Sequence, residues 1–174
     1  IELSQNKLSA FLPISIGMLD LGAAWVDNYI RTCLSEALAL GYETAIVTGT
    51  GNNMPIGMDR SVADNVTVTG GVYPQKDAIA VTDFGRASYG NLVAQLAKTQ
   101  YGKARAVTGL VLVCNPQDYF KLVLPATTLL TPEGQYVNNV LPYPTTIIQS
   151  VAVESGKAIL GIGKNYFLGV AGGR

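Results

Sequence analysis

The chain has 174 residues, and its 12 Lys and Arg balance its 12 Asp and Glu, so it lacks the net positive field that attracts nucleic acid. Only 14% of the residues are charged and 48% are hydrophobic, yet no apolar run approaches the roughly 18 residues of a membrane span. The length predicts one domain or two small lobes that bury roughly 70% of the unfolded surface. We interpret the low charge as a sign that other subunits cover part of the apolar surface.

The first half of the chain is dominated by one long helical pattern. Residues 1–16 alternate loosely and predict an incoming strand with Pro13 at its edge. Asp20 is a possible N-cap and Gly41 a natural stop, so we predict an amphipathic spine helix over residues 20–41. Residues 43–48 either extend this helix or form a short strand. The predicted apolar face consists of Val26, Tyr29, Ile30, Cys33, Leu34, Ala37 and Leu40.

Shorter elements follow. Residues 59–78 predict a loop or short hairpin, and Asp83 caps a second helix that stops near Gly102. Residues 109–114 predict a strand covered on both faces. Asn115 and Pro116 then give an N-cap and a first helical position for a short helix over 117–124, which Pro125 ends.

The last third of the sequence is rich in proline and glycine and then in β-branched residues. Residues 125–144 predict a long surface loop, which in a compact domain is usually functional or at an interface. Residues 146–153, 158–162 and 166–170 predict three strands joined by tight turns. The chain is therefore expected to have an α+β fold.

The residues of common catalytic and metal sites are scarce. The chain has no histidine, which removes Ser–His–Asp and Cys–His activation and all histidine-containing metal sites. Cys33 and Cys114 lie far apart in apolar segments and are interpreted as reduced core residues. The basic residues Arg86, Lys98, Lys103 and Arg105 have little aromatic interleaving and indicate a solvated face. We expect no catalytic residue, no cofactor and no metal.

The glycine-rich segment Gly49–Gly57, with the sequence GTGNNMPIG, is the one candidate for a phosphate site. A P-loop needs a lysine that this segment lacks, and Pro55 removes a backbone donor. A dinucleotide fingerprint needs a third glycine where Met54 stands. We interpret the segment as a structural turn made by Gly49, Gly51, Asn52, Asn53, Pro55 and Gly57.

The order of these motifs is similar to that of a known family. An apolar segment (FLPIS, 11–15) precedes the long helix and GTGNNMPIG, and a strand, Asn115-Pro116, a short helix and PEGQY (132–136) follow. This pattern resembles the major capsid protein of tailed double-stranded DNA bacteriophages, whose fold is shared with encapsulin shells and the herpesvirus capsid floor.

The resemblance implies an architecture and one set of interface residues. Residues 1–79 would hold the return strand of an extended loop and a peripheral domain with the spine helix. Residues 80–174 would form an axial α/β domain whose central sheet is flanked by helices. The loop formed by Thr131, Pro132, Glu133, Gly134, Gln135 and Tyr136 would point toward the capsomer axis and contact other subunits. Some members cross-link subunits through a Lys–Asn bond, but no residue here matches those positions.

The resemblance also implies a function. The chain would be the core fragment of a non-enzymatic capsid subunit that assembles with itself into hexamers and pentamers around double-stranded DNA. Scaffold, protease and portal proteins would be partners, the DNA would be enclosed without sequence-specific contact, and no membrane would be involved. The subunit would assemble in the bacterial host cytoplasm and reside in the virion. Two alternatives are an encapsulin-type shell and a nucleotide-binding enzyme that uses Gly49–Gly57.

Overall fold

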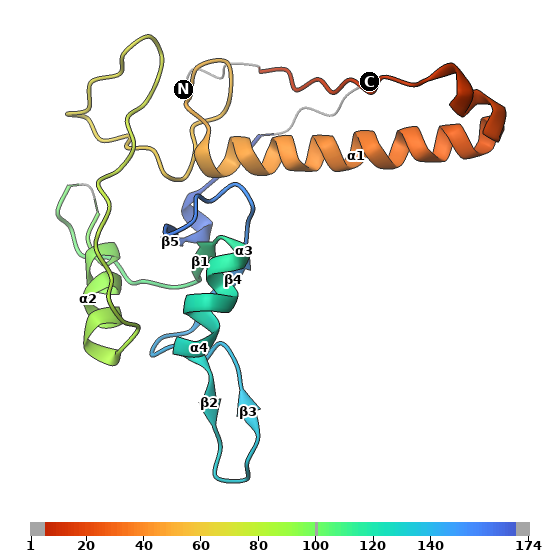
Figure 1. Ribbon diagram of the computed structural model, residues 1–174. Helices are drawn as coiled ribbons and strands as arrows, with labels where there is room; N and C mark the ends of the chain where they lie inside the picture. The colour runs from red at the N-terminus through yellow and green to blue at the C-terminus, as the bar shows by residue number, and fades with distance from the viewer. Residues whose placement is uncertain (1–5, 100, 170–174) are drawn as a thin grey trace.

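The computed structural model describes residues 6–99 and 101–169 and shows a mixed α/β, L-shaped molecule (Figure 1). One limb, here called the arm, consists of residues 6–21 and the long helix α1 (Ala23–Thr48). The other limb, here called the body, contains a three-stranded sheet and the shorter helices α2, α3 and α4. A projecting hairpin extends from the end of the body. The predicted coexistence of helices and small sheets is therefore confirmed.

Helix α1 differs from the predicted spine helix at both ends. It has 26 residues, which at 1.5 Å per residue gives a rod of about 39 Å. It begins after Gly22 rather than at Asp20, because Ile16–Leu21 form a separate 3₁₀ turn, η1. Gly41 lies inside the helix and does not end it. A Cβ at Gly41 would lie 3.0 Å from the Leu8 side chain. The absence of a side chain at residue 41 therefore leaves room for Leu8 to pack on the helix.

Residues 6–15 run antiparallel to α1 along the arm (Figure 1). The predicted incoming strand over 1–16 is wrong for residues 6–15, which form no strand, and residues 1–5 lie outside the described part of the chain. The partner of this segment is a helix, whose backbone groups are already paired, so no ladder of hydrogen bonds can form.

The sheet of the body has the order β4-β1-β5. Its central strand β1 (Leu110–Cys114) runs parallel to β4 (Thr145–Gln149) and antiparallel to β5 (Ala158–Ile162). One face of β1 packs on Tyr119 and Val123, and the other face packs Val113 on Val47 of α1 and Val153. The prediction of a strand covered on both faces is confirmed, and β1 is the centre of the core.

The predicted tight turn at residues 154–157 is present, with the Lys157 N–H donating to the Glu154 carbonyl at 3.1 Å, but β4 and β5 are not neighbouring strands of a hairpin. Strand β4 ends at Gln149 rather than Val153, and the next residues cross the end of β1. There the Ser150 N–H donates to the Cys114 carbonyl at 2.9 Å, and the Asn115 side-chain amide donates to the Val153 carbonyl at 2.9 Å. The predicted strand over 166–170 is also wrong for residues 166–169, which follow a 3₁₀ turn, η3 (Gly163–Asn165); residue 170 lies outside the described residues.

The helix after β1 continues past the proline that was predicted to end it. Asn115 caps α3 (Pro116–Asp118) as predicted, and its side chain accepts from the Gln117 N–H. A π-helical turn, η2 (Tyr119–Val123), leads directly into α4 (Leu124–Thr127). The π turn shifts the hydrogen-bond register by one residue, so Pro125 enters the first turn of a new segment, where its missing N–H is tolerated.

The remaining elements complete the body. Helix α2 (Arg86–Leu96) confirms the second predicted helix but ends before Gly102. The Asp83 carboxylate accepts from the Gly85 N–H and the Ser88 hydroxyl at its start, and these hydrogen bonds lower its pKa. The predicted long loop over 125–144 contains the end of α4 and a hairpin of β2 (Leu129–Leu130) and β3 (Tyr136–Val137).

The chain buries less surface than its length predicts. A compact monomer of 18.4 kDa exposes about 8200 Å², whereas this chain exposes 12667 Å². The extended chain would expose about 26700 Å², so folding buries about half of the surface and the expected 70% is wrong. The reason is the shape, because a helical arm and a hairpin that project from a small body have few neighbours.

Candidate functional site

The segment after α1 is a closed corner, defined here as residues 49–60. The Gly49 N–H donates to the Ala45 carbonyl at 3.2 Å, the Gly51 N–H to the Pro55 carbonyl at 3.3 Å, and the Gly57 N–H to the Gly49 carbonyl at 2.8 Å. Two more donors, the N–H groups of Met58 and Asp59, reach the carbonyls of Ile46 and Val47 at the helix end. The corner thus satisfies carbonyls that a helix C-terminus normally leaves free.

The glycines of the corner are required by close backbone approach. A Cβ at Gly49 would overlap the carbonyl oxygens of Pro55 and Ala45, and one at Gly57 would lie 2.6 Å from the Gly49 nitrogen. Gly51 has a φ of +89°, and a Cβ there would lie 2.6 Å from the Tyr73 ring. Asn53 also has positive φ, at 54°, as predicted for an asparagine in a turn.

Arg60 fastens the corner, and the sequence analysis missed it. Its Nη2 donates to the Thr48 carbonyl at the end of α1 and its Nη1 to the Tyr73 carbonyl, each at 3.1 Å. Its Nε lies 3.3 Å from Asp59 Oδ1, an ion pair whose geometry is not that of a hydrogen bond. Both side chains are mostly buried, at 14% and 17% exposed. A cation at a helix C-terminus is favourable, but Arg60 lies 12 residues beyond the last residue of α1, so no local pattern connected it with the helix end.

Two further side chains bind the corner to the segment that follows it. The Gln75 side-chain amide donates to Asp59 Oδ2 at 2.9 Å, and the Lys76 ammonium donates to the Met58 carbonyl at 2.9 Å. Burial lowers the pKa of Lys76 from its ordinary value. The corner is therefore a network of internal hydrogen bonds.

The corner does not have the form of a phosphate cradle. Such a cradle presents free backbone N–H groups to the anion, whereas the N–H groups of Gly49, Gly51 and Gly57 all donate to carbonyls of this chain. The structure brings the six predicted turn residues together, in the structural role that the sequence analysis favoured.

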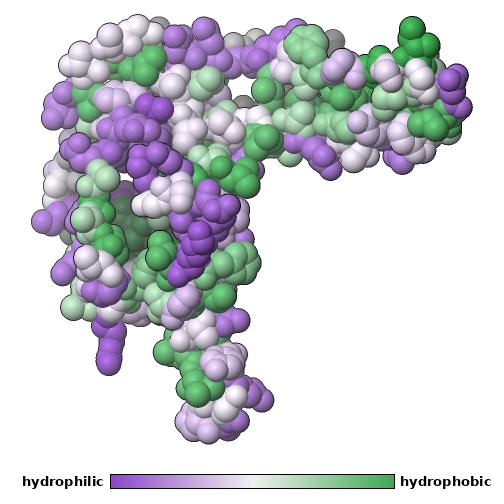
Figure 2. Space-filling view, in the orientation of Figure 1, coloured by the Kyte–Doolittle hydropathy of each residue, from purple (hydrophilic) through white to green (hydrophobic). Residues whose placement is uncertain are grey.

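Of the six predicted interface residues, Thr131–Gln135 form the tip of the projecting hairpin and Tyr136 is the first residue of β3 (Figure 1). The Thr131 N–H donates to the Gln135 carbonyl at 2.8 Å, the Gly134 N–H donates to the Thr131 carbonyl at 2.9 Å, and Gly134 has a φ of +80°. The apolar strand residues behind the tip are all exposed: Leu129, Leu130, Tyr136 and Val137. Figure 2 shows hydrophobic surface in green on the projecting hairpin, behind a more polar tip. A pair of two-residue strands has no core of its own.

The base of the hairpin is held more firmly than its tip. The Val140 N–H donates to the Thr127 carbonyl at 2.8 Å, and the Tyr119 hydroxyl donates to Asn139 Oδ1 at 2.8 Å. Thr127 is buried, and its hydroxyl donates to the Val123 carbonyl. The hairpin is therefore a projecting element on a fixed base.

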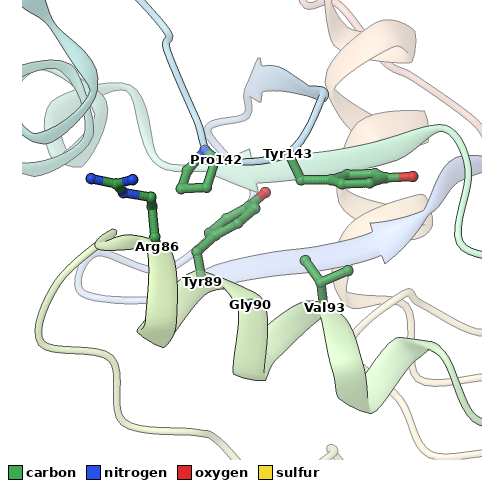
Figure 3. A pocket seen from close by; sticks show the side chains of 6 residues that line it. All are labelled: Arg86, Tyr89, Gly90, Val93, Pro142 and Tyr143. Atoms are coloured by element: carbon green, nitrogen blue, oxygen red, sulfur yellow. The ribbon is translucent and has the colours of Figure 1, made fainter.

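A shallow hollow of about 300 Å³ lies between α2 and the segment before β4 (Figure 3). Its polar tyrosine groups are already engaged, since the Tyr89 hydroxyl pairs with the Thr145 hydroxyl and the Tyr143 hydroxyl donates to the Val107 carbonyl at 2.6 Å. Apart from Arg86 its lining is tyrosine, glycine, valine and proline: Tyr89, Gly90, Val93, Pro142 and Tyr143. This lining offers neither a nucleophile nor a carboxylate.

The cysteines behave as core residues. Cys114 is buried and Cys33 partly buried, and both are free thiols. Burial, with a smaller effect from the Asp118 carboxylate, raises the pKa of the Cys114 thiol. A neutral buried thiol is a poor nucleophile.

Among residues 6–99 and 101–169, no three His, Cys, Asp or Glu side chains gather closely enough to hold a metal ion. No helix in the same part of the chain is long and apolar enough to span a membrane.

Comparison with known proteins gives one result. A protein-family model, the Phage capsid family, matches residues 1–156. Searches of curated proteins and of solved structures found no match.

Proposed function

This chain belongs to the phage capsid family and is thus a structural capsid component, and from that premise we propose that it is the major capsid subunit of a tailed double-stranded DNA phage. In this role it assembles with itself into the hexamers and pentamers of an icosahedral shell. The family match covers α1, the corner, the hairpin and the body up to residue 156, so of the sheet it includes β1 and β4 but not β5.

The observation that carries the proposal is the surface that the chain leaves uncovered. Its exposed area exceeds that of a compact monomer by about 4500 Å². A standard interface covers about 800 Å² of each partner, so the excess matches several interfaces for each subunit. A shell subunit surrounded by neighbours needs that many contacts.

The two limbs fit different parts of a capsomer in this proposal. The arm, with residues up to 79, belongs to a peripheral domain, and the body, from residue 80, forms an axial domain. The hairpin tip at Thr131–Tyr136 then meets the hairpins of neighbouring subunits near the capsomer axis. Exposed apolar strand residues with no core of their own support this role.

The partners follow from the same role. The virion is the proposed location, reached by assembly in the bacterial cytoplasm with scaffold, protease and portal proteins. The formal charge of zero gives the subunit no net attraction for the DNA phosphates, which fits DNA that is enclosed by the shell rather than bound by each subunit.

Electron microscopy of the purified chain, expressed alone and with its phage scaffold and protease, tests the proposal. We expect closed shells or isolated capsomers with five-fold or six-fold symmetry. Soluble monomers under every condition would overturn it.

A further inference from the structure

One face of α1 is covered by the body at one end and left open along the rest of the arm. We call it the lower face; it consists of Trp25, Tyr29, Glu36, Leu40, Glu43 and Val47, which a period of 3.6 residues places within about 60° of one another. At the body end Val47 is buried against Val113 and Val153. One turn earlier, the Glu43 carboxylate accepts from the Val151 N–H at 3.1 Å.

Farther along the arm the same face has no cover. Leu40 is 50% exposed, Tyr29 is 37% exposed and Trp25 is 47% exposed. The opposite side of the helix is different, because Leu8 packs on Gly41 there and Leu34 and Leu38 are partly buried. Figure 1 shows that the part of α1 that extends away from the body has no helix or strand beside it on the inner side of the L.

The free part of the lower face is already ordered. The rings of Trp25 and Tyr29 stack with centroids 5.3 Å apart and an angle of 6° between their planes. Large aromatic side chains with fixed rotamers lose little entropy on binding and are frequent anchors of interfaces. Arg31 lies on another side of the helix and is paired with Asp27 at 2.8 Å, so the aromatic pair faces outward without a cation beside it.

We propose that the lower face of the arm docks a second copy of this chain, with Trp25, Tyr29 and Leu40 as its anchors. The face continues an interface that already exists within the chain at Val47, and the uncovered area of about 4500 Å² exceeds what the hairpins can cover alone, since one standard interface takes about 800 Å² from each partner. The exposed carboxylate of Glu36 on the same face disfavours a nucleic acid as the occupant. The choice of a second copy rests on the proposed capsid function.

The fluorescence of the full chain tests this contact directly, because Trp25 is its single tryptophan. We expect a blue shift of the emission and protection from acrylamide as the protein concentration rises and subunits associate. Emission that stays at the exposed-indole position in assembled protein would overturn the proposal.

A matched pair of variants gives an independent measurement. Tyr29 and Tyr42 are exposed to 37% and 42%, but Tyr42 lies about 140° around the helix from Tyr29. Tyr29→Ser should weaken self-association in sedimentation experiments about 30-fold, the factor that corresponds to about 2 kcal/mol for an interface anchor, whereas Tyr42→Ser should leave it unchanged. Equal behaviour of the two variants would overturn the proposal. Leu40→Ser should reduce the concentration-dependent shift of Trp25 without touching the indole.

These results separate the arm contact from the proposed function. Shells that form while Trp25 stays exposed would refute the arm contact and leave the capsid function standing. A blue shift in small oligomers that never form shells under any condition would support the contact and refute the capsid function.

Discussion

The corner and the hairpin tip are both glycine-containing reversals, and they differ in what surrounds the glycine. In the corner, an added Cβ at Gly57 would meet backbone atoms of Gly49, Thr48 and Val47 within 2.8 Å. In the hairpin tip, an added Cβ at Gly134 would meet nothing within 4 Å, and only the positive φ favours glycine. The corner is packed against its own chain, and the tip is surrounded by solvent.

The difference separates a structural turn from a contact surface. Corner residues such as Arg60 and Asp59 pair with groups of the same chain, so mutations there should change the free energy of unfolding. Hairpin residues such as Leu130 and Tyr136 are exposed, so mutations there should change association instead. Four predictions test this contrast, from the largest expected effect on stability to the smallest.

Gly57→Ala should lower the free energy of unfolding by about 3 kcal/mol, the upper end of the cost of overpacking. The new methyl group would lie 2.6 Å from the Gly49 nitrogen. Because the position of a Cβ is fixed by the backbone, a change of side-chain rotamer cannot relieve this overlap. Urea denaturation followed by circular dichroism measures the change. Gly17→Ala is the matched control, since a Cβ there meets nothing within 4 Å. A loss below about 1 kcal/mol for Gly57→Ala would show that the corner is not close-packed.

Arg60→Met should lower the free energy of unfolding by about 2 kcal/mol, because the carbonyls of Thr48 and Tyr73 lose their donors and the Asp59 carboxylate loses its ion pair. The same denaturation experiment measures it. Arg31→Met removes an exposed ion pair with Asp27 and should leave the free energy of unfolding nearly unchanged, because water screens the attraction between the two charges. Equal losses for the two arginines would contradict the role assigned to Arg60.

Gly134→Ala should cost about 1 kcal/mol, the strain of a non-glycine residue at a φ of +80° with free space around it. Gly90→Ala, in the exposed part of α2, should have the opposite sign and stabilise the protein by about 0.5 kcal/mol. Thermal unfolding of both variants distinguishes the signs. A loss at Gly134 as large as that at Gly57 would mean that the tip is packed after all.

The double variant Leu130→Ser/Tyr136→Ser should change the free energy of unfolding by less than about 0.5 kcal/mol, because both side chains are exposed in the isolated subunit. Its assembly into capsomers, observed by electron microscopy, should be lost. Normal assembly of this variant would show that the hairpin is not an interface between subunits. The capsid function would then be tested by the assembly of the wild-type chain alone.

Elements whose sequence contained a complete local signal were predicted well. The run Leu110–Cys114 is the buried strand, Asn115 and Pro116 begin a helix, and Gly49–Gly57 is a turn. Each depends on interactions within a few residues: apolar side chains on both faces, a side-chain cap, or a glycine that admits a close carbonyl. The free thiol of Cys114 in the core follows from the same strand.

Elements whose outcome depends on distant residues were predicted poorly. Gly41 lies inside α1, where the missing side chain leaves room for Leu8, a residue far away in the sequence. Pro125 is accommodated because a π turn precedes it. Arg60 matters only because Thr48 and Tyr73 meet beside it in space.

The sequence by itself determined that the chain has a long helix and a second helix, that residues 110–114 are a buried strand and that the chain reverses at Gly49–Gly57, since these follow from hydrophobic period and backbone sterics. Only the tertiary structure decided that β1 lies between β4 and β5, where one helix ends and which apolar side chains stay uncovered. The physical reason is that a side chain is buried only when another segment of the chain packs on it, and that segment can be far away in the sequence. Leu40 of the lower face and Leu129 and Leu130 of the hairpin are as apolar as core residues, and only the three-dimensional arrangement shows that this chain leaves them exposed.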